Sequence, residues 1–432
     1  MLGGIACARQ LGTMKNSNPT LRGIAAIILF NTLGSVSGGA PTHEQRFARL
    51  SDTKGAQALI ELRNSPSAEL RLRSEPDIAE FSSCTTNWTT LPKRVFLEPT
   101  IYNGVQARVA VHQVGNSSND TVYACFHGIL SQAEDWRHVA GALSGKHELW
   151  LIDLPGCGQS DCLEPRSAGQ GGYSPRALAD RVLQALSARL AERPQVSRVI
   201  MVGHSFGGLV VLRMFADDEV RLRHAQVLDR VQGLALFAPA DVVVQATETW
   251  KAFLSIDPVK ARLGGMLQIL QAKVADSVRD GFRKPDLASR EMAIEGIQTL
   301  RDGPHRRAMQ QIMLEAIPWR GRDFGKHPDW AKAHDLEDGY RNVTAPCLIV
   351  WGKCDETLPE AMGHKLNDQL PNSRLVLLAD TMHLLPLERP VACAELLQQF
   401  SRELETGKLA AVRSVTNLEL TEGGKAFTVA GE

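Results

Sequence analysis

The sequence lacks a net charge, and it lacks the common metal-binding spacings. Lysine and arginine together number 48, and aspartate and glutamate also number 48. No overall basic field therefore favours nucleic acid or an anionic membrane surface. The chain contains no Cys-x-x-Cys pair and no His-Glu-x-x-His run, which are spacings typical of zinc sites. We expect no metal, no organic cofactor and no nucleic-acid partner.

Cysteine is too sparse to build a disulfide framework, because only eight occur in a chain of 432 residues. Cys157 and Cys162 lie close enough in sequence to pair in an oxidising compartment. Cys125 and Cys347 lie within apolar runs, where we expect small core residues. Hydrophobic residues make up 44% of the chain and charged residues 22%, which is a composition typical of a globular protein with a sizeable core.

No apolar run at the N-terminus is long enough to span a bilayer, which needs about 20 residues. Lys15 and Arg22 precede the run GIAAIILF, and small residues follow it. This order is typical of a secretory signal. We predict a signal peptide over residues 1–40, cleaved between about Ser37 and Ala40, and an exported protein, periplasmic or secreted. The alternative is an uncleaved apolar segment on a cytoplasmic protein.

Sequence patterning divides the rest of the chain. Apolar runs alternate with amphipathic helical runs over residues 95–240 and again over 342–406, which indicates a parallel sheet covered on both faces. Residues 241–341 contain helical runs without a convincing strand, so we expect a helical cap inserted into the sheet domain. Residues 41–94 form a mixed polar extension, and residues 407–432 form a polar tail. The predicted fold class is α/β, with a mostly parallel doubly wound sheet and an inserted helical cap.

Individual elements follow from the same periodicities. Strands are predicted at 108–115, 121–128, 147–156, 196–205, 231–240, 345–352 and 373–380. Helices are predicted at 135–144, 174–193, after residue 205 and at 390–405, and within the cap at 258–278, 289–300 and 306–317. Ser174 is a suitable N-cap, because Pro175 occupies the first helical position after it.

The run VIMVGHSFGG places Ser205 between a buried strand and an apolar helix. In a Gly-x-Ser-x-Gly elbow, the serine sits on a sharp turn at the carboxyl end of the sheet. Gly203 and Gly207 are needed there because a Cβ would clash where strand and helix pass closely. A glycine-rich turn without catalysis is the alternative, but the strand before and the helix after are the context that the motif requires.

A serine nucleophile needs a base, and the base needs an acid that orients it. Asp355 follows one buried strand and His383 follows the next, so both should lie at the same sheet edge as Ser205. The order Ser, Asp, His is the one expected for such a fold. Asp241, after an earlier strand, is an alternative acid, whereas Asp380 is too close in sequence to His383 to orient it.

The tetrahedral oxyanion of acyl transfer needs two N–H donors. We expect one from the backbone of Phe206, the residue after the nucleophile, and one from the backbone of Ile129 in an early loop. His127 and Gly128 are expected to support that loop, and His204 to pack beside the elbow.

The segments HGIL, DLPGCGQSD, GHSFGG, WGKCDETLP and MHLLPLERP together resemble the α/β-hydrolase superfamily, in the branch with a helical cap, over residues 95–404. The resemblance specifies the fold well and the substrate poorly, because the branch includes esterases, lipases, thioesterases, carbon–carbon bond hydrolases and haloperoxidase-like members. Members that hydrolyse epoxides or haloalkanes use an aspartate nucleophile, and Ser205 argues against both.

We therefore hypothesise a serine hydrolase that cleaves a carboxylic ester or related small-molecule acyl substrate through an acyl-enzyme. One alternative is a carbon–carbon bond hydrolase of ring-cleavage products with the same triad. Another is a binding protein that kept the fold without the reaction. No obligatory membrane span is expected, and the oligomeric state stays open.

Overall fold

The computed structural model describes residues 88–116, 118–143, 145–163, 172–240, 282, 303–316, 338–407, 414–420 and 426–428. The predicted signal peptide and most of the predicted extension lie outside these residues. So do the two predicted cap helices at 258–278 and 289–300, and the alternative acid Asp241.

Ten strands form one sheet in the order β1-β2-β4-β3-β5-β6-β7-β8-β9-β10. They are β1 (Lys93–Tyr102), β2 (Val105–Gly115), β3 (Thr121–Phe126), β4 (Glu148–Ile152), β5 (Arg198–His204), β6 (Val231–Phe237), β7 (Cys347–Gly352), β8 (Ser373–Leu378), β9 (Val415–Leu420) and β10 (Ala426–Thr428). The pairs β1–β2, β2–β4 and β9–β10 are antiparallel, and the other neighbouring pairs are parallel. The mostly parallel sheet predicted from the sequence is confirmed. After β3 the chain adds β4 on one side and β5 on the other, so the topological switch point, where open α/β sheets bind ligands, lies beside β3 and β5.

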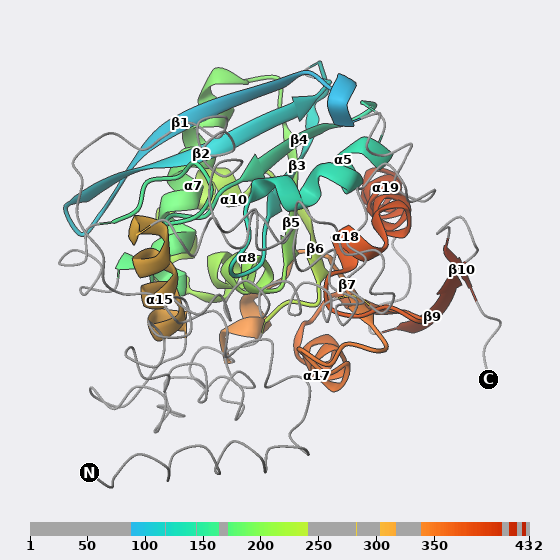
Figure 1. Ribbon diagram of the computed structural model, residues 1–432. Helices are drawn as coiled ribbons and strands as arrows, with labels where there is room; N and C mark the ends of the chain where they lie inside the picture. The colour runs from blue at the N-terminus through green and yellow to red at the C-terminus, as the bar shows by residue number, and fades with distance from the viewer. Residues whose placement is uncertain are drawn as a thin grey trace, which may run out of the picture.

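Helices cover both faces of this sheet. They are η2 (Ala133–Trp136), α5 (Arg137–Ala142), α7 (Pro175–Glu192), α8 (Phe206–Ala216), α9 (Asp218–Arg223), α10 (Ala225–Leu228), α15 (Gly303–Ala316), η5 (Gly339–Asn342), α17 (Ala361–Gln369), α18 (Leu385–Glu388) and α19 (Pro390–Thr406). Helices α7 and α8 pack together on one side of the strands, and α5 and α19 pack together on the other (Figure 1). The predicted cap of α7 is confirmed, because the side chain of Ser174 accepts a hydrogen bond from the backbone N–H of Ala177, and Pro175 is the first helical residue.

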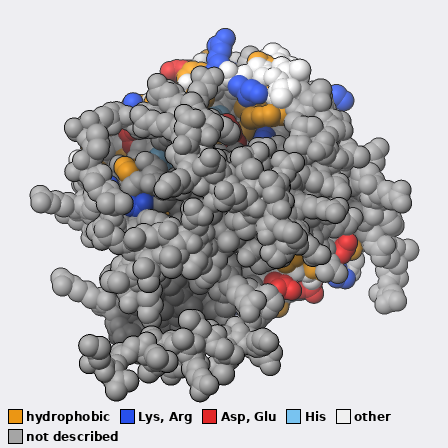
Figure 2. Space-filling model, viewed as in Figure 1, with side chains coloured by type: hydrophobic (Ala, Val, Ile, Leu, Met, Phe, Trp, Pro, Cys, Tyr) orange, Lys and Arg blue, Asp and Glu red, His pale blue; other side chains and the backbone are white. Residues whose placement is uncertain are grey.

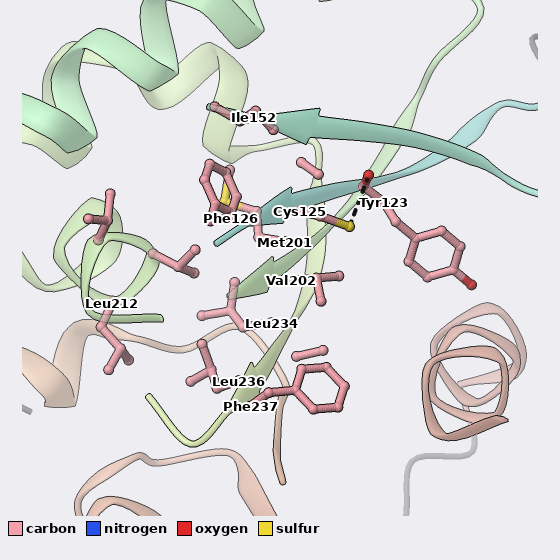
Figure 3. Packing of buried hydrophobic residues seen from close by; sticks show 14 of the residues in the cluster. Tyr123, Cys125, Phe126, Ile152, Met201, Val202, Leu212, Leu234, Leu236 and Phe237 are labelled. Carbon is pink, nitrogen blue, oxygen red and sulfur yellow. Dashed lines mark hydrogen bonds between the residues drawn. The ribbon is translucent and has the colours of Figure 1, made fainter. Parts of the chain in front are cut away.

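The core lies in the middle of the sheet, where the central strands are apolar on both faces. Figure 3 shows side chains of β3, β5 and β6 packed against Leu212 of α8. Cys125 and Cys347 are buried in this core, as predicted. The possible pairing of Cys157 with Cys162 is wrong for this structure, because both thiols are free.

Both ends of the sheet extend beyond the predicted strands. Strand β1 carries Pro99, which lowers strand propensity but is tolerated at a sheet edge. The C-terminal segment is not only a polar tail, because β9 pairs with β8 and β10 pairs with β9. Within β9 the side chain of Leu418 is buried, whereas Val415 is exposed. Such short edge strands carry too weak an apolar signal to stand out in the sequence.

The longest described segment of the predicted cap is α15, which matches the predicted helix at 306–317. Its His305 Nε2 lies 3.0 Å from the carbonyl oxygen of Gly158, in the loop after β4. At its other end, the carboxylate of Glu315 accepts a hydrogen bond of 2.8 Å from the backbone N–H of Tyr173. These contacts fix α15 to the segments that follow β4 and precede α7.

Strand β1 also carries exposed apolar side chains, namely Val95, Leu97 and Ile101. The upper part of Figure 2, where β1 and β2 lie in Figure 1, shows apolar and basic side chains side by side. The free edge is interrupted by Pro99, and the side-chain amide of Gln184 bonds both the N–H and the carbonyl of Ile101. These features limit pairing of this edge with another strand.

Candidate active site

The turn between β5 and α8 holds Ser205 in a strained backbone conformation. Its φ angle is +50°, which costs a residue with a side chain on the order of 1–3 kcal/mol. Two glycines make the turn possible. A Cβ on Gly203 would lie 2.6 Å from the Cα of Gly208, and a Cβ on Gly207 would lie 2.4 Å from the carbonyl oxygen of Phe126. Both glycines therefore occupy the positions where the sequence predicted that only glycine fits.

His383 lies between Ser205 and Asp355 and contacts both. Its Nδ1 is 2.8 Å from Oδ2 of Asp355, and its Nε2 is 2.9 Å from Oγ of Ser205. The three residues are 7%, 6% and 7% exposed in the order His383, Asp355 and Ser205. The structure thus brings together three side chains from the loops after β5, β7 and β8.

The second oxygen of Asp355 explains how this carboxylate is oriented. Oδ1 accepts hydrogen bonds from the backbone N–H groups of Thr357 at 2.9 Å and Leu358 at 2.8 Å. An ionised carboxylate only accepts, so Nδ1 of His383 carries the hydrogen and Nε2 is left to accept from the hydroxyl of Ser205. This tautomer is the one that can take a proton from a serine.

Two other acids were considered as partners of this histidine. Asp241 lies outside the described residues. Asp380 lies in the turn after β8 with a φ of +48°, and its carbonyl accepts a hydrogen bond from Nη2 of Arg389. The acceptor for the N–H at Nδ1 of His383 is Oδ2 of Asp355.

His127 is fixed inside the loop after β3. Its Nε2 accepts a hydrogen bond of 3.0 Å from the backbone N–H of Leu154, so its Nδ1 donates to the carbonyl of Gly128 at 2.7 Å. Burial lowers the pKa of His127 below its ordinary value. A neutral ring with both nitrogens bonded supports the loop and has no free nitrogen for proton transfer.

The loop after β3 lies directly against the elbow. A Cβ on Gly128 would lie 3.4 Å from the Cβ of Ser205. Ile129 follows Gly128 and packs against the core, and Phe206 is the first residue of α8. Among the described residues, neither backbone N–H of these two has a hydrogen-bond acceptor. Phe206 thus follows Ser205 directly and Ile129 follows the glycine that faces Ser205, and their role as oxyanion donors stays a prediction.

His204 packs beside the elbow, as the sequence predicted. Its Nε2 lies 2.8 Å from the carbonyl oxygen of His383. The burial of the ring, followed by the nearby His383, lowers the pKa of His204 to about 3.

Two supporting groups were missed in the sequence. The buried carboxylate of Glu388, at the end of α18, accepts a hydrogen bond of 2.8 Å from the backbone N–H of Met382. His112 of β2 bonds the buried carboxylate of Asp153 at 2.8 Å. The motif LPLERP after His383 contains Glu388 but does not by itself indicate its supporting role. The alternating pattern of β2 does not distinguish His112 from a surface residue.

Within the described residues, no group of three or more His, Cys, Asp or Glu side chains could hold a metal ion. The same part of the chain contains no helix that is both long and apolar enough to cross a membrane.

Comparison with known proteins shows which family this chain resembles. The model of the alpha/beta hydrolase family matches residues 124–396. The uncharacterised hydrolase YugF of Bacillus subtilis (strain 168) is 26% identical over 285 residues, which are 64% of this chain and 88% of YugF.

Two solved structures illustrate the range of chemistry on this fold. The esterase RhEst1 from Rhodococcus sp. ECU1013 has a TM-score of 0.51 and 20% identity, covering 72% of this chain and 99% of that one. The haloalkane dehalogenase DatA from Agrobacterium tumefaciens C58 has a TM-score of 0.54 and 16% identity, covering 74% and 99%. At these identities the likeness shows the fold alone. The match to the family model spans more than half of the sequence, so this chain belongs to the alpha/beta hydrolase family.

Proposed function

We propose that this protein is a serine hydrolase that cleaves a carboxylic ester or a related small-molecule acyl substrate. The observation that carries the proposal is the unbroken hydrogen-bond chain from Ser205 through His383 to Asp355. Ser205, at the first position of this hydrogen-bond chain, lies on a strained elbow beside the switch point of the sheet, where α/β folds bind their ligands.

In the proposed reaction, the Oγ of Ser205 attacks the substrate carbonyl carbon while Nε2 of His383 takes the hydroxyl proton. Asp355 stabilises the resulting imidazolium. The tetrahedral intermediate expels the alcohol, which receives that proton from His383, and an acyl-enzyme remains. Water then attacks the acyl carbon with His383 again as base, which releases the acid and restores Ser205.

The negative oxygen of the intermediate needs preorganised donors, each worth about 10²- to 10³-fold in rate. We assign this role to the backbone N–H groups of Ile129 and Phe206. The dipole of α8 adds to it, because the N-terminus of a helix favours negative charge.

The proposal is tested by comparing the wild type with Ser205→Ala on a short-chain aryl ester and with a fluorophosphonate probe. Loss of the nucleophile should lower the rate by at least about 10³-fold and abolish labelling. Ser118→Ala, in the exposed turn before β3, is the control and should behave as the wild type. Wild-type activity in Ser205→Ala would contradict the proposal.

The substrate class is tested separately. A vinylogous diketone, the kind of compound that a carbon–carbon bond hydrolase cleaves, is compared with esters of graded chain length. Turnover of the esters with little or no turnover of the diketone supports the proposed class. Turnover of the diketone with little or no turnover of the esters would keep Ser205 as the nucleophile but make the protein a carbon–carbon bond hydrolase.

We also propose that residues 1–40 direct export and that residues 241–341 form a helical cap over the site. The basic, apolar and small-residue order of the N-terminus supports the first, and the docking of α15 on the loop after β4 supports the second. N-terminal sequencing of the mature protein should find a new terminus near Ala40, whereas an intact Met1 would contradict export.

A further inference from the structure

His204 contacts the loop of the proposed base through a single defined hydrogen bond. Because the carbonyl oxygen of His383 can only accept, Nε2 of His204 must carry the hydrogen of this 2.8 Å bond. His204 is 5% exposed, and the centroid of its ring lies 5.1 Å from the ring centroid of His383. The residue next to the nucleophile therefore holds the backbone of the base.

The other side of the His204 ring faces the loop after β3. A Cβ on Gly128 would lie 3.2 Å from Nδ1 of His204, which is tighter than most such contacts. Three segments thus meet at this ring: the elbow at Ser205, the loop at Gly128 and the loop at His383. A glycine at position 128 therefore leaves space for the imidazole ring of His204, which a larger residue would reduce.

The peptide groups next to His383 are held at two points. The N–H of Met382 donates to the carboxylate of Glu388, and the carbonyl of His383 accepts from His204. A backbone fixed on both sides sets the direction in which the imidazole of His383 leaves the loop. That direction decides whether its Nε2 reaches Ser205 at 2.9 Å while its Nδ1 reaches Asp355 at 2.8 Å.

We propose that His204 is a positioning residue for the base, which ties the nucleophile elbow to the loop of His383 through its Nε2–H. This inference rests on the proposed serine hydrolase function. His204 touches no reacting atom in this scheme. It acts by holding His383 in line between Ser205 and Asp355.

The charge state of His204 fits this role. Its neighbours among titratable groups are His383 and His127, and the burial of the ring is the main cause that lowers the pKa of His204. A neutral His204 adds no positive charge beside the imidazolium that forms on His383 during the reaction. A protonated ring 5.1 Å away would oppose that imidazolium.

The test replaces His204 by three residues in the full chain. His204→Gln keeps an N–H donor at a similar distance from the backbone, whereas His204→Phe and His204→Leu keep apolar bulk and lose the donor. We expect kcat for the ester to fall roughly 10- to 100-fold in the Phe and Leu variants, as for a misplacement of about 1 Å. KM should change little, and His204→Gln should recover most of the lost kcat.

Thermal unfolding separates this role from a general loss of structure. A purely structural role predicts that kcat follows the fraction of folded protein and that KM and kcat of the folded fraction stay unchanged. Equal kcat per folded molecule in His204→Gln, His204→Leu and the wild type would overturn the inference.

A measurement on the wild type needs no substitution. Nitrogen NMR of the imidazoles should find His204 neutral with hydrogen on Nε2 from pH 5 to pH 9. Titration of His204 within this range, or hydrogen on Nδ1, would overturn the inference. Failure of the proposed function looks different, because the wild type would then resist the fluorophosphonate probe whatever the state of His204.

Discussion

Replacement of Asp355 by asparagine tests how the base is oriented. The variant keeps the size of the side chain and the two backbone donors that hold it. Because the N–H groups of Thr357 and Leu358 both point at Oδ1, the amide oxygen must stay at that position. The amide nitrogen then faces Nδ1 of His383, 2.8 Å away, and donates to it.

This reversal changes the tautomer of His383. Nδ1 must accept, so the hydrogen moves to Nε2, which faces Oγ of Ser205 at 2.9 Å and can no longer take its proton. Such a reversal costs a serine triad about 10⁴-fold in kcat, which corresponds to about 5.4 kcal/mol of transition-state stabilisation. The fold should be retained, since the shape and the two backbone hydrogen bonds are unchanged.

The assay is steady-state ester hydrolysis together with the rate of fluorophosphonate labelling. Both rates should fall in Asp355→Asn while the melting temperature stays near that of the wild type. Glu356→Gln removes a charge from the next, exposed residue and should leave both rates unchanged. A kcat for Asp355→Asn within tenfold of the wild type would refute the assignment of the acid and direct attention to Asp241.

Three further predictions concern residues around the site and at the far end of the sheet. Gly207→Ala places a Cβ 2.4 Å from a backbone carbonyl oxygen, so we expect a lower melting temperature by calorimetry and a loss of esterase rate of about 10²-fold. Burial alone would lower the pKa of His112, but the hydrogen bond and charge of Asp153 outweigh burial, so the pKa of His112 is raised. The pKa of Asp153 is lowered, with His112 as its hydrogen-bond partner. The pair should therefore stabilise the fold fully between about pH 4 and 6.5, less as the pH rises through the raised value or falls through the lowered one. Urea unfolding of the wild type and His112→Gln should differ most at pH 5 and less at pH 9. Finally, Glu148→Ala removes the buried carboxylate that pairs with the guanidinium of Arg193 and accepts from Gln113 and Trp150, which should cost about 3–5 kcal/mol in urea unfolding and leave kcat of the folded enzyme unchanged.

The sequence could predict those parts of the site that depend on local rules. Gly203 and Gly207 were identifiable because the elbow needs clearance on both sides, and the structure has backbone atoms at both points. Strands β7 and β8, which precede Asp355 and His383, were identifiable because a strand buried on both faces has a continuous apolar sequence.

The supporting contacts could not be predicted in the same way. The bond from His204 to the carbonyl of His383 joins residues 179 positions apart, and no local pattern encodes it. Strand β1 pairs on one side only, and β9 is short with few buried residues, so their apolar signal is weak. Glu388 looked like an ordinary helical acid, because its role depends on a backbone N–H that only the turn after β8 brings to it.

The strain at Ser205 is held by hydrogen bonds on both sides of the elbow. The N–H of Ser205 donates to the carbonyl of Phe237 at the end of β6, and its carbonyl accepts from the N–H groups of Leu209 and Ala240. The positive φ angle persists because these three bonds leave the turn no relaxed alternative within the sheet. The same bonds point the side chain of Ser205 toward His383 rather than into the core. In this molecule the cost of the strained turn and the position of the hydroxyl therefore have one cause, which is the set of hydrogen bonds that ties the elbow to α8 and to the end of β6.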